Sequence, residues 1–230
     1  MALNTVERID ERVRVRTILA SVSDKTGLAS FVAGLLSVNP DLRILSTGGT
    51  HAAIAAALGS AAGRVLQQVS AYTGQPEMQG GLVKTLDFKI YLGLLSETYN
   101  TAHRADLART GASAIDMVVV NLYPFERAVA APGATVEGAR GNIDIGGPCM
   151  VRAAAKNFHR VAALTDPADY PSILAELQAH GGALSLETRF ALAQKAFRLT
   201  SGYDAAIAEY LGSLPVDRVR AAYRIEEGEA

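Results

Sequence analysis

The segment NIDIGGPCMVRAAAKNF, residues 142–158, places an acid and two cations around a tight turn. Asp144 stands just before a Gly-Gly-Pro sequence, and Pro148 suits the first turn of a following helix. Arg152 and Lys156 are four residues apart, so they share one helical face. An acid and a base held together can move protons. The same spacing also fits a structural interpretation, in which Asp144 interacts with the helix dipole and the two basic residues are solvated. The spacing alone does not decide between this interpretation and a functional site.

Two other loops combine hydroxyl groups with glycines. SVSDKTG begins at residue 21 and STGGT at residue 46, and each follows a short apolar run. Neither is a Walker loop or a dinucleotide fingerprint, so together they predict a cradle for a phosphate on a small substrate. Alternatively, Ser23 or Asp24 caps one helix and Thr50 caps the other. The expected phosphate-site residues are Ser21, Ser23, Lys25, Thr26, Ser46, Gly48, Gly49 and Thr50.

Four more polar residues lie where a ligand is expected. Lys84 and Thr85 follow glycines in a long irregular loop, where a cation can meet an oxyanion. Asn121 and Tyr123 end the apolar run IDMVVVNLY, and the end of a strand is where an amide and a phenol can face a ligand. Each residue also has a non-functional interpretation. Position alone favours Lys84 as an ordinary surface lysine, and it also fits Asn121 as a turn residue and Tyr123 as a rim aromatic whose hydroxyl lies in water.

Composition narrows the class of protein. Of the 230 residues, 49% are hydrophobic and 20% charged, with a net charge of −1, so we expect a small-molecule partner and no nucleic acid. No apolar run approaches the roughly 20 residues that span a membrane. The single cysteine, Cys149, fits a reducing, cytoplasmic compartment, and we interpret it as a packing residue. The four histidines lack metal-ligand spacing, so no metal site is expected.

Short apolar runs alternate with longer helical patterns, which predicts an α/β domain whose parallel sheet is covered on both faces. From Ser185 onward, apolar residues at helical spacing predict a long helical region, interrupted near Gly202, that packs against the domain. The charged N-terminus predicts an exposed helix or a flexible lead-in. The predicted strands cover residues 16–22, 42–47, 64–69, 115–123 and 160–166, and the predicted helices include 28–38, 50–59 and 170–181.

The motifs SVSDKTGL, STGGT, GGLVKTL, VVNLYPF and NIDIGGPCMVRAAAKN resemble, in order and approximate spacing, those of the IMP cyclohydrolase domain. That domain forms the amino-terminal half of bifunctional purine-biosynthesis proteins that also carry an AICAR transformylase. The resemblance covers residues 17–211, which we take as one domain between a lead-in, 1–16, and a tail, 212–230. It implies a methylglyoxal-synthase-like, three-layer α/β/α fold with a mainly parallel sheet and a C-terminal helical region.

The resemblance also implies an activity, the closure without a cofactor of 5-formamidoimidazole-4-carboxamide ribotide (FAICAR) to IMP with loss of water. By position, the two hydroxyl-rich loops would hold the 5′-phosphate. Matching catalytic residues are Lys84, Tyr123, Asp144 and Lys156, and the purine would contact Thr85, Asn121, Ile145, Gly146 and Gly147. We hypothesise that the first two catalytic residues stabilise an oxyanion and that the other two handle protons. These roles can be exchanged without contradicting the sequence.

Four positions depart from the family. The usual Arg, His, Pro and His are replaced by Leu82, Asp87, Phe88 and Tyr91. Loss of the arginine removes a rigid cationic fork. We therefore expect another cation, such as Lys89 or Arg152, to replace it, or substrate binding or the rate to differ.

Three functions stay open from the sequence. The first is a cyclohydrolase without a folate site, because the chain ends where the transformylase half would begin. The second is a non-catalytic nucleotide-binding or scaffolding relative. The third is a methylglyoxal-synthase-like phosphate lyase, against which the NLYPF and IDIGGPCMVRAAAKN motifs argue. For the first, the expected partners are FAICAR and IMP, a second copy in a homodimer, and a separate AICAR formyl-transferring enzyme.

Overall fold

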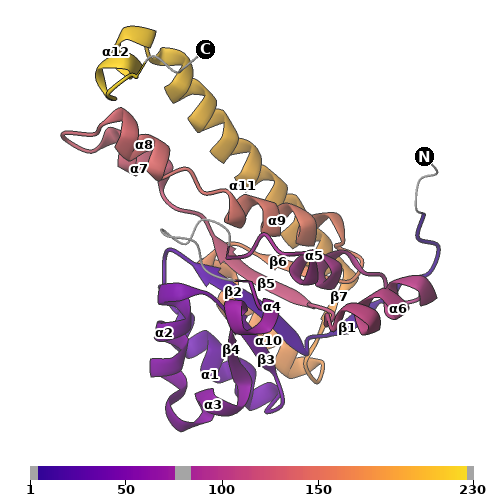
Figure 1. The fold of residues 1–230 in the computed structure, drawn as a ribbon. Helices are drawn as coiled ribbons and strands as arrows, with labels where there is room; N and C mark the ends of the chain where they lie inside the picture. The colour runs from indigo at the N-terminus through magenta and orange to yellow at the C-terminus, as the bar shows by residue number, and fades with distance from the viewer. Residues whose placement is uncertain (1–4, 76–83, 227–230) are drawn as a thin grey trace.

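The computed structural model describes residues 5–75 and 84–226. A five-stranded sheet lies at the centre, in the order β4-β3-β2-β5-β6, and every neighbouring pair is parallel (Figure 1). The prediction of an α/β domain with a mainly parallel sheet is therefore confirmed. The five strands are β2 (Thr17–Val22), β3 (Arg43–Ser46), β4 (Leu66–Gln68), β5 (Met117–Asn121) and β6 (Ala162–Leu164).

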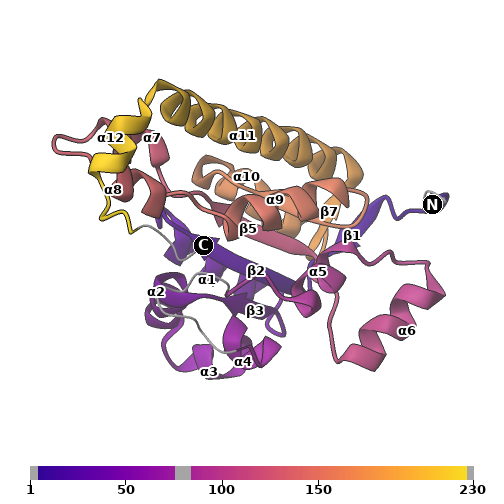
Figure 2. The same ribbon diagram turned by 45° about the horizontal axis from the view of Figure 1, so that its top comes forward.

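Helices cover both faces of this sheet and give the expected three layers (Figures 1 and 2). One face packs against α1 (Leu28–Val38), α2 (Gly48–Leu58) and α10 (Tyr170–Ala179). The other packs against α5 (Phe88–Leu95), α9 (Gly146–Lys156) and part of α11 (Leu186–Ser213). The smaller helices are α3 (Ala62–Val65), α4 (Val69–Thr73), α6 (Thr101–Thr110), α7 (Phe125–Ala130), α8 (Val136–Gly141) and α12 (Val216–Ala221).

Strand β2 shows why the sheet needs two covered faces. Ile18 and Ala20 lie in the core on the α1 side, whereas Leu19 lies in the core on the α9 side. Successive strand residues point to opposite faces, so consecutive buried apolar residues require a layer of helices on each side. The continuous apolar run was therefore an adequate signal for a central parallel strand.

Helix α11 is one continuous helix of 28 residues, so the predicted interruption near Gly202 is wrong. A glycine inside a helix costs only about 1 kcal/mol relative to alanine, which packing along the helix can offset. Figure 2 shows α11 passing α9 and continuing to α7 and α8. No described helix, α11 included, has the length and apolarity needed to cross a membrane.

Three local features differ from the sequence-based expectations. The long loop after β4 contains α4 and the start of α5. Residues 64 and 65 belong to α3, so the predicted third strand shortens to Leu66–Gln68. In the expected lead-in, β1 (Arg12–Arg14) pairs antiparallel with β7 (Ala183–Ser185). The buried guanidinium of Arg189 fastens this corner, because it donates to the carbonyls of Asp10 and Glu11 and to that of Leu184.

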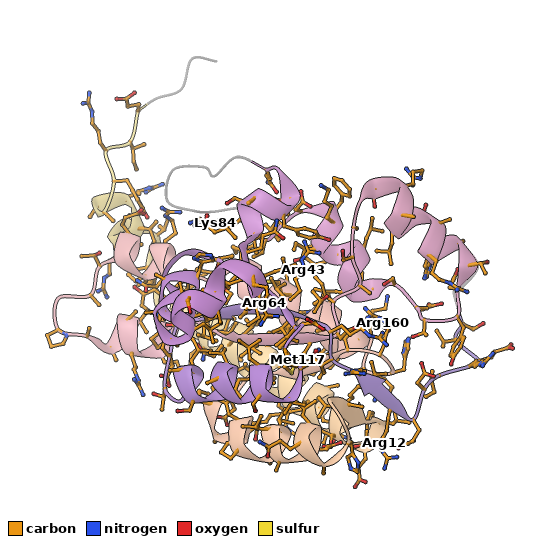
Figure 3. All side chains as sticks on the ribbon, turned by 90° about the horizontal axis from the view of Figure 1, so that it is seen from below. Arg12, Arg43, Arg64, Lys84, Met117 and Arg160 are labelled. Carbon is orange, nitrogen blue, oxygen red and sulfur yellow. The ribbon has the colours of Figure 1, made fainter. Side chains whose placement is uncertain are left out.

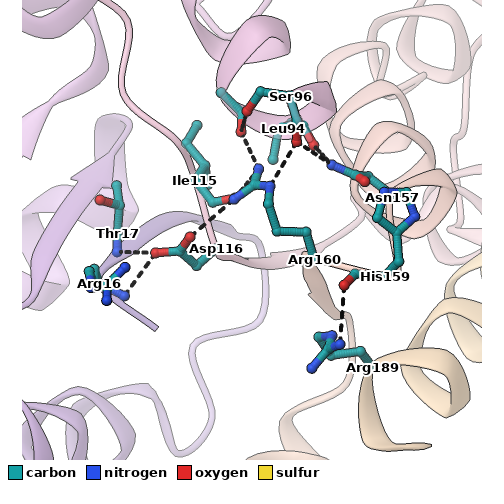
Figure 4. A network of polar contacts seen from close by, with 11 residues as sticks. Arg16, Thr17, Leu94, Ser96, Ile115, Asp116, Asn157, His159, Arg160 and Arg189 are labelled. Atoms are coloured by element: carbon teal, nitrogen blue, oxygen red, sulfur yellow. Dashed lines mark hydrogen bonds and ion pairs between the residues drawn. The ribbon is translucent and has the colours of Figure 1, made fainter. Parts of the chain in front are cut away.

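A buried ion pair holds the edge of the sheet where the strands begin (Figure 4). Asp116, which precedes β5, lies 3.1 Å from Arg160, which precedes β6, and both are more than nine-tenths buried. Asp116 also accepts hydrogen bonds from the backbone N–H groups of Arg16 and Thr17, at the start of β2. Burial raises the pKa of Asp116, while Arg160 and those N–H groups act in the opposite direction. One carboxylate thus links the starts of three strands.

Replacing Asp116 with Asn should lower the free energy of unfolding by about 3–5 kcal/mol, because Arg160 is then left as an unpaired buried charge. Urea unfolding measures this change. Asp106→Asn is the matched control, because it breaks the exposed Asp106–Arg109 pair and should cost less than about 1 kcal/mol. Equal small losses in both variants would contradict the role assigned to the buried pair.

Candidate functional site

A cavity of about 480 Å³ opens at the edge of the sheet where β2, β3 and β5 end. This volume is typical of a small-molecule site, and the carboxyl edge of a parallel sheet is where such ligands bind. Its walls combine the strand ends with the first turns of α2 and α9 and with the segment at residues 84–85. The lining residues are Ser21, Val22, Ser23, Lys25, Thr47, Gly48, Gly49, Thr50, Lys84, Thr85, Asn121, Tyr123, Gly141, Ile143, Asp144, Ile145, Gly146, Gly147 and Met150.

One end of the cavity is suited to an anion. Helix α2 begins with Gly48 and Gly49. Because these two residues have no side chain, an anion can come close to the first backbone N–H groups of the helix. A Cβ atom built on Gly48 would lie 3.9 Å from Nζ of Lys84, and one built on Gly49 would lie 3.9 Å from Nζ of Lys25. Two ammonium groups therefore flank the positive end of the helix dipole. Figure 3 shows Lys84 on the opposite side of the molecule from Arg12.

The polar residues around this anion end fix its loops to one another. The hydroxyls of Ser21 and Thr47 lie 3.0 Å apart, across the ends of β2 and β3. Thr50 does not cap α2, because its buried hydroxyl bonds the N–H and the carbonyl of Val22. These contacts join the helix to the end of β2 and hold the first turn of α2 in the cavity wall.

Asn121 lines the cavity, but its amide is used within the protein. Its Oδ1 accepts the N–H groups of Ser23 and Asp24 at 2.7 and 2.9 Å, and its Nδ2 donates to the carbonyl of Asp24. The side chain therefore shapes the loop that carries Lys25. We had expected the amide to face a ligand, and the observed contacts make it a residue that positions the anion end.

The other end of the cavity carries a half-buried carboxylate. Oδ1 of Asp144 accepts the N–H of Gly147 in the first turn of α9 at 2.9 Å. Burial raises the pKa of Asp144, although backbone hydrogen bonds from Gly147 and Tyr123 oppose the shift. A carboxyl group with a raised pKa in a cavity is suited to proton transfer. The phenol of Tyr123 and the side chain of Ile145, both more than half exposed, lie at the same end.

The two glycines at the start of α9 are required by close contacts. A Cβ on Gly146 would lie 2.6 Å from the hydroxyl of the buried Thr85. A Cβ on Gly147 would lie 2.8 Å from Cδ2 of Leu122 and 2.9 Å from Cγ of Asp144. The absence of side chains at these two glycines thus lets the carboxylate of Asp144 reach the first turn of α9.

Three residues predicted for the site do not line the cavity. Lys156 ends α9, whose 11 residues span about 15 Å, so it lies at the far end of the helix from Asp144. The buried hydroxyl of Ser46 bonds the carbonyl of Ala20. The hydroxyl of Thr26 bonds the carboxylate of Asp24. The remaining predicted positions do line the cavity.

Three of the four substituted positions, Asp87, Phe88 and Tyr91, do not line the cavity. Leu82 falls outside the described residues. Asp87 caps α5 by accepting the N–H of Lys89. Nζ of Lys89 donates to the carbonyls at the end of α4, and Arg152 stacks on Phe197, so neither expected substitute cation lines the cavity. Phe88 is exposed, and burial is the main cause that raises the pKa of the half-buried Tyr91.

Several lining residues were missed in the sequence, for different reasons. Thr47 is part of the STGGT motif and could have been included. Met150 lies one helical turn after Gly146, so a helix beginning at that glycine points to it. Val22, Gly141 and Ile143 carry no chemical signal of their own. Among the described residues, no group of three or more His, Cys, Asp or Glu side chains could hold a metal ion.

The fold and the cavity define a parallel α/β domain in which a helix N-terminus flanked by two ammonium groups and a half-buried carboxylate line one pocket. A family model described as an MGS-like domain matches residues 27–149, and one described as the AICARFT/IMPCHase bienzyme matches residues 154–228. The chain therefore belongs to the MGS-like family and corresponds to the IMP cyclohydrolase domain of PurH proteins.

Individual relatives agree with this assignment. The bifunctional purine biosynthesis protein PurH of Chlorobium phaeovibrioides is 49% identical over 208 residues, which are 90% of this chain and 38% of that protein. PurH of Neisseria meningitidis is 49% identical over 203 residues, which are 88% and 37%. The chain thus spans well under half the length of these relatives. The crystal structure of ForH is 36% identical, with a TM-score of 0.72, and covers 86% of this chain and 100% of its own.

Replacing Gly147 with Ala should destabilise the protein by about 1–3 kcal/mol, because the new methyl group meets Asp144 and Leu122. The matched control is Gly202→Ala, a helix position with nothing within 4 Å of the added atom. Alanine should stabilise the control by up to about 1 kcal/mol through helix propensity. Urea unfolding compares the two variants, and a Gly147→Ala protein as stable as the control would show that the close contact is not needed.

Proposed function

We propose that this chain closes FAICAR to IMP with release of water. The observation that carries the proposal is that one cavity is lined both by two ammonium groups at the first turn of α2 and by a half-buried carboxylate at the first turn of α9. A ribotide carries its phosphate at one end and its reacting base at the other. The cavity therefore offers an anchor for the phosphate and a proton-transfer group where the ring closes.

The reaction needs proton transfers and stabilisation of one transient oxyanion. The carboxamide nitrogen attacks the formyl carbon, which forms the C–N bond and turns the formyl oxygen into a hydroxyl as the nitrogen loses a proton. The formamido nitrogen then loses its proton, the hydroxyl gains one, and water leaves as the ring double bond forms. Orienting the two groups accounts for much of the rate gain, because attack becomes a reaction within one bound molecule.

The positions of the side chains favour specific roles. Asp144 accepts and returns the protons, because its raised pKa brings it closer to the working pH. The exposed phenol of Tyr123 donates to the developing oxyanion from the same end of the cavity. Lys84 holds the phosphate together with Lys25, because its Nζ lies against the first turn of α2. This replaces the oxyanion role first considered for Lys84.

Two wider expectations remain proposals. PurH relatives are named bifunctional, which supports a formyl-transferring activity as the functional partner of this domain. We propose that this partner delivers FAICAR. We also propose a homodimer, which sedimentation of the purified chain tests directly.

The pH dependence of kcat/KM should report the half-buried carboxyl group of Asp144. Because burial raises the pKa of Asp144 above its ordinary value of 3.8, the group stays protonated to higher pH and cannot act as a base there. The acid limb of kcat/KM, which reports groups of the free enzyme, should therefore have its midpoint above pH 3.8. Steady-state kinetics across about pH 4 to 8 measures it. Loss of activity only at or below pH 3.8, in protein that remains folded, would exclude Asp144 as the base.

Replacing Lys84 with Ala should raise KM for FAICAR by at least about tenfold, with a smaller change in kcat, because a phosphate contact is made in both ground and transition states. An ultraviolet assay of IMP formation measures both constants. The matched control is Lys89→Ala, which removes a cation from the same segment that bonds carbonyls outside the cavity.

The outcomes of this assay separate the candidate functions. An unchanged kcat/KM in Lys84→Ala would remove this lysine from the site. A fall confined to kcat would support the role first considered for Lys84, stabilisation of the oxyanion. A folded wild-type protein that binds IMP but forms none from FAICAR would favour the non-catalytic relative over the enzyme.

A further inference from the structure

We propose that Tyr203 is a positioning residue that holds Asp144 in place through the backbone, an inference that rests on the proposed ring closure. Tyr203 lies on α11, outside the residues that line the cavity. Neither the sequence motifs nor the resemblance points to it. Its hydroxyl reaches the loop between α8 and α9 that carries the carboxylate.

Both hydrogen-bonding functions of this hydroxyl are used by the loop. Oη of Tyr203 accepts the N–H of Asp144 at 2.8 Å and donates to the carbonyl of Asn142 at 3.2 Å. It thus bridges two peptide groups two residues apart. The carboxylate of Asp144 then accepts the N–H of Gly147, so the residue is fixed at its backbone and at its side chain. Such double fixation is what a proton-transfer group needs in order to keep its geometry.

The helix that carries Tyr203 is itself anchored on both sides. About two turns earlier, Nζ of Lys195 pairs with the carboxylates of Asp166 and Asp169 at 2.7 and 2.8 Å. The ring of Tyr203 lies edge-on to Phe125, which is 1% exposed, at a centroid distance of 6.3 Å. The continuity of α11 through Gly202 transmits this anchoring to the hydroxyl.

The same helix offers an internal comparison. Tyr210 also lies edge-on to Phe125, at 5.7 Å, but within the described residues its hydroxyl makes no hydrogen bond. The two tyrosines therefore share a helix and an aromatic partner and differ in contact with the loop at residues 142–144. Packing alone would make both hydroxyls dispensable, whereas positioning makes only that of Tyr203 important.

The test compares Tyr203→Phe with Tyr210→Phe in the full chain. In Tyr203→Phe, kcat for IMP formation should fall about tenfold to a hundredfold while KM changes less than about twofold, because ring packing and the phosphate anchor are retained. Amide hydrogen exchange at residues 142–147 should speed up by about tenfold. Tyr210→Phe should change neither quantity.

Amide hydrogen exchange tests the positioning role of Tyr203 independently of enzymatic activity. If wild-type protein does not convert FAICAR, the proposed function fails, and faster exchange confined to Tyr203→Phe still supports the positioning contact. Equal exchange at residues 142–147 in both variants overturns the inference. So does a kcat in Tyr203→Phe within about twofold of an active wild type.

Discussion

The buried pair of Asp116 and Arg160 is the constraint on which the rest of the structure depends. It links the starts of β2, β5 and β6, and a slip of any of these strands would leave a charged group unpaired in the interior. The parallel register of β2 and β5 extends from this edge to their carboxyl ends, where Val22 pairs with Asn121. The cavity at the carboxyl edge is therefore set by an interaction at the opposite edge of the same sheet.

At the carboxyl edge, two helix N-termini converge on one cavity with different chemistry. The first turn of α2 is bare at its glycines and faces two ammonium groups, whereas the first turn of α9 binds the carboxylate of Asp144. The glycines of α9 allow the close approach of other side chains of the protein, and we propose that those of α2 allow the close approach of an anion. In the proposed function, a single ligand meets the ammonium groups at α2 and the proton-transfer group at α9.

Local signals in the sequence were sufficient for much of this arrangement. Continuous apolar runs predicted the strands, and loops after successive strands predicted the residues of the anion end, because parallel strands bring their carboxyl ends together. Lys156 does not line the cavity, because it lies at the far end of an 11-residue helix, so its catalytic role rests on the resemblance alone and stays a prediction. The break expected in α11 was wrong because the cost of one glycine is small beside the packing of a long helix.

The contacts that no local pattern reveals are those between distant segments. Arg160 and Asp116 are separated by 44 residues, and Tyr203 and Asp144 by 59. Asn121 was recognised as a site residue, but only its bonds to a loop 97 and 98 residues away show that its amide positions that loop. Such roles depend on tertiary structure, so spacing along the chain carries no information about them.

The most direct test of the central claim is a crystal structure of the chain with IMP. Our account predicts the phosphate at the first turn of α2, within hydrogen-bond distance of Nζ of both Lys25 and Lys84, and the purine beside Tyr123 and Asp144. A phosphate bound away from α2, or a purine that does not reach Asp144, would contradict the division of the cavity into an anchoring end and a reacting end.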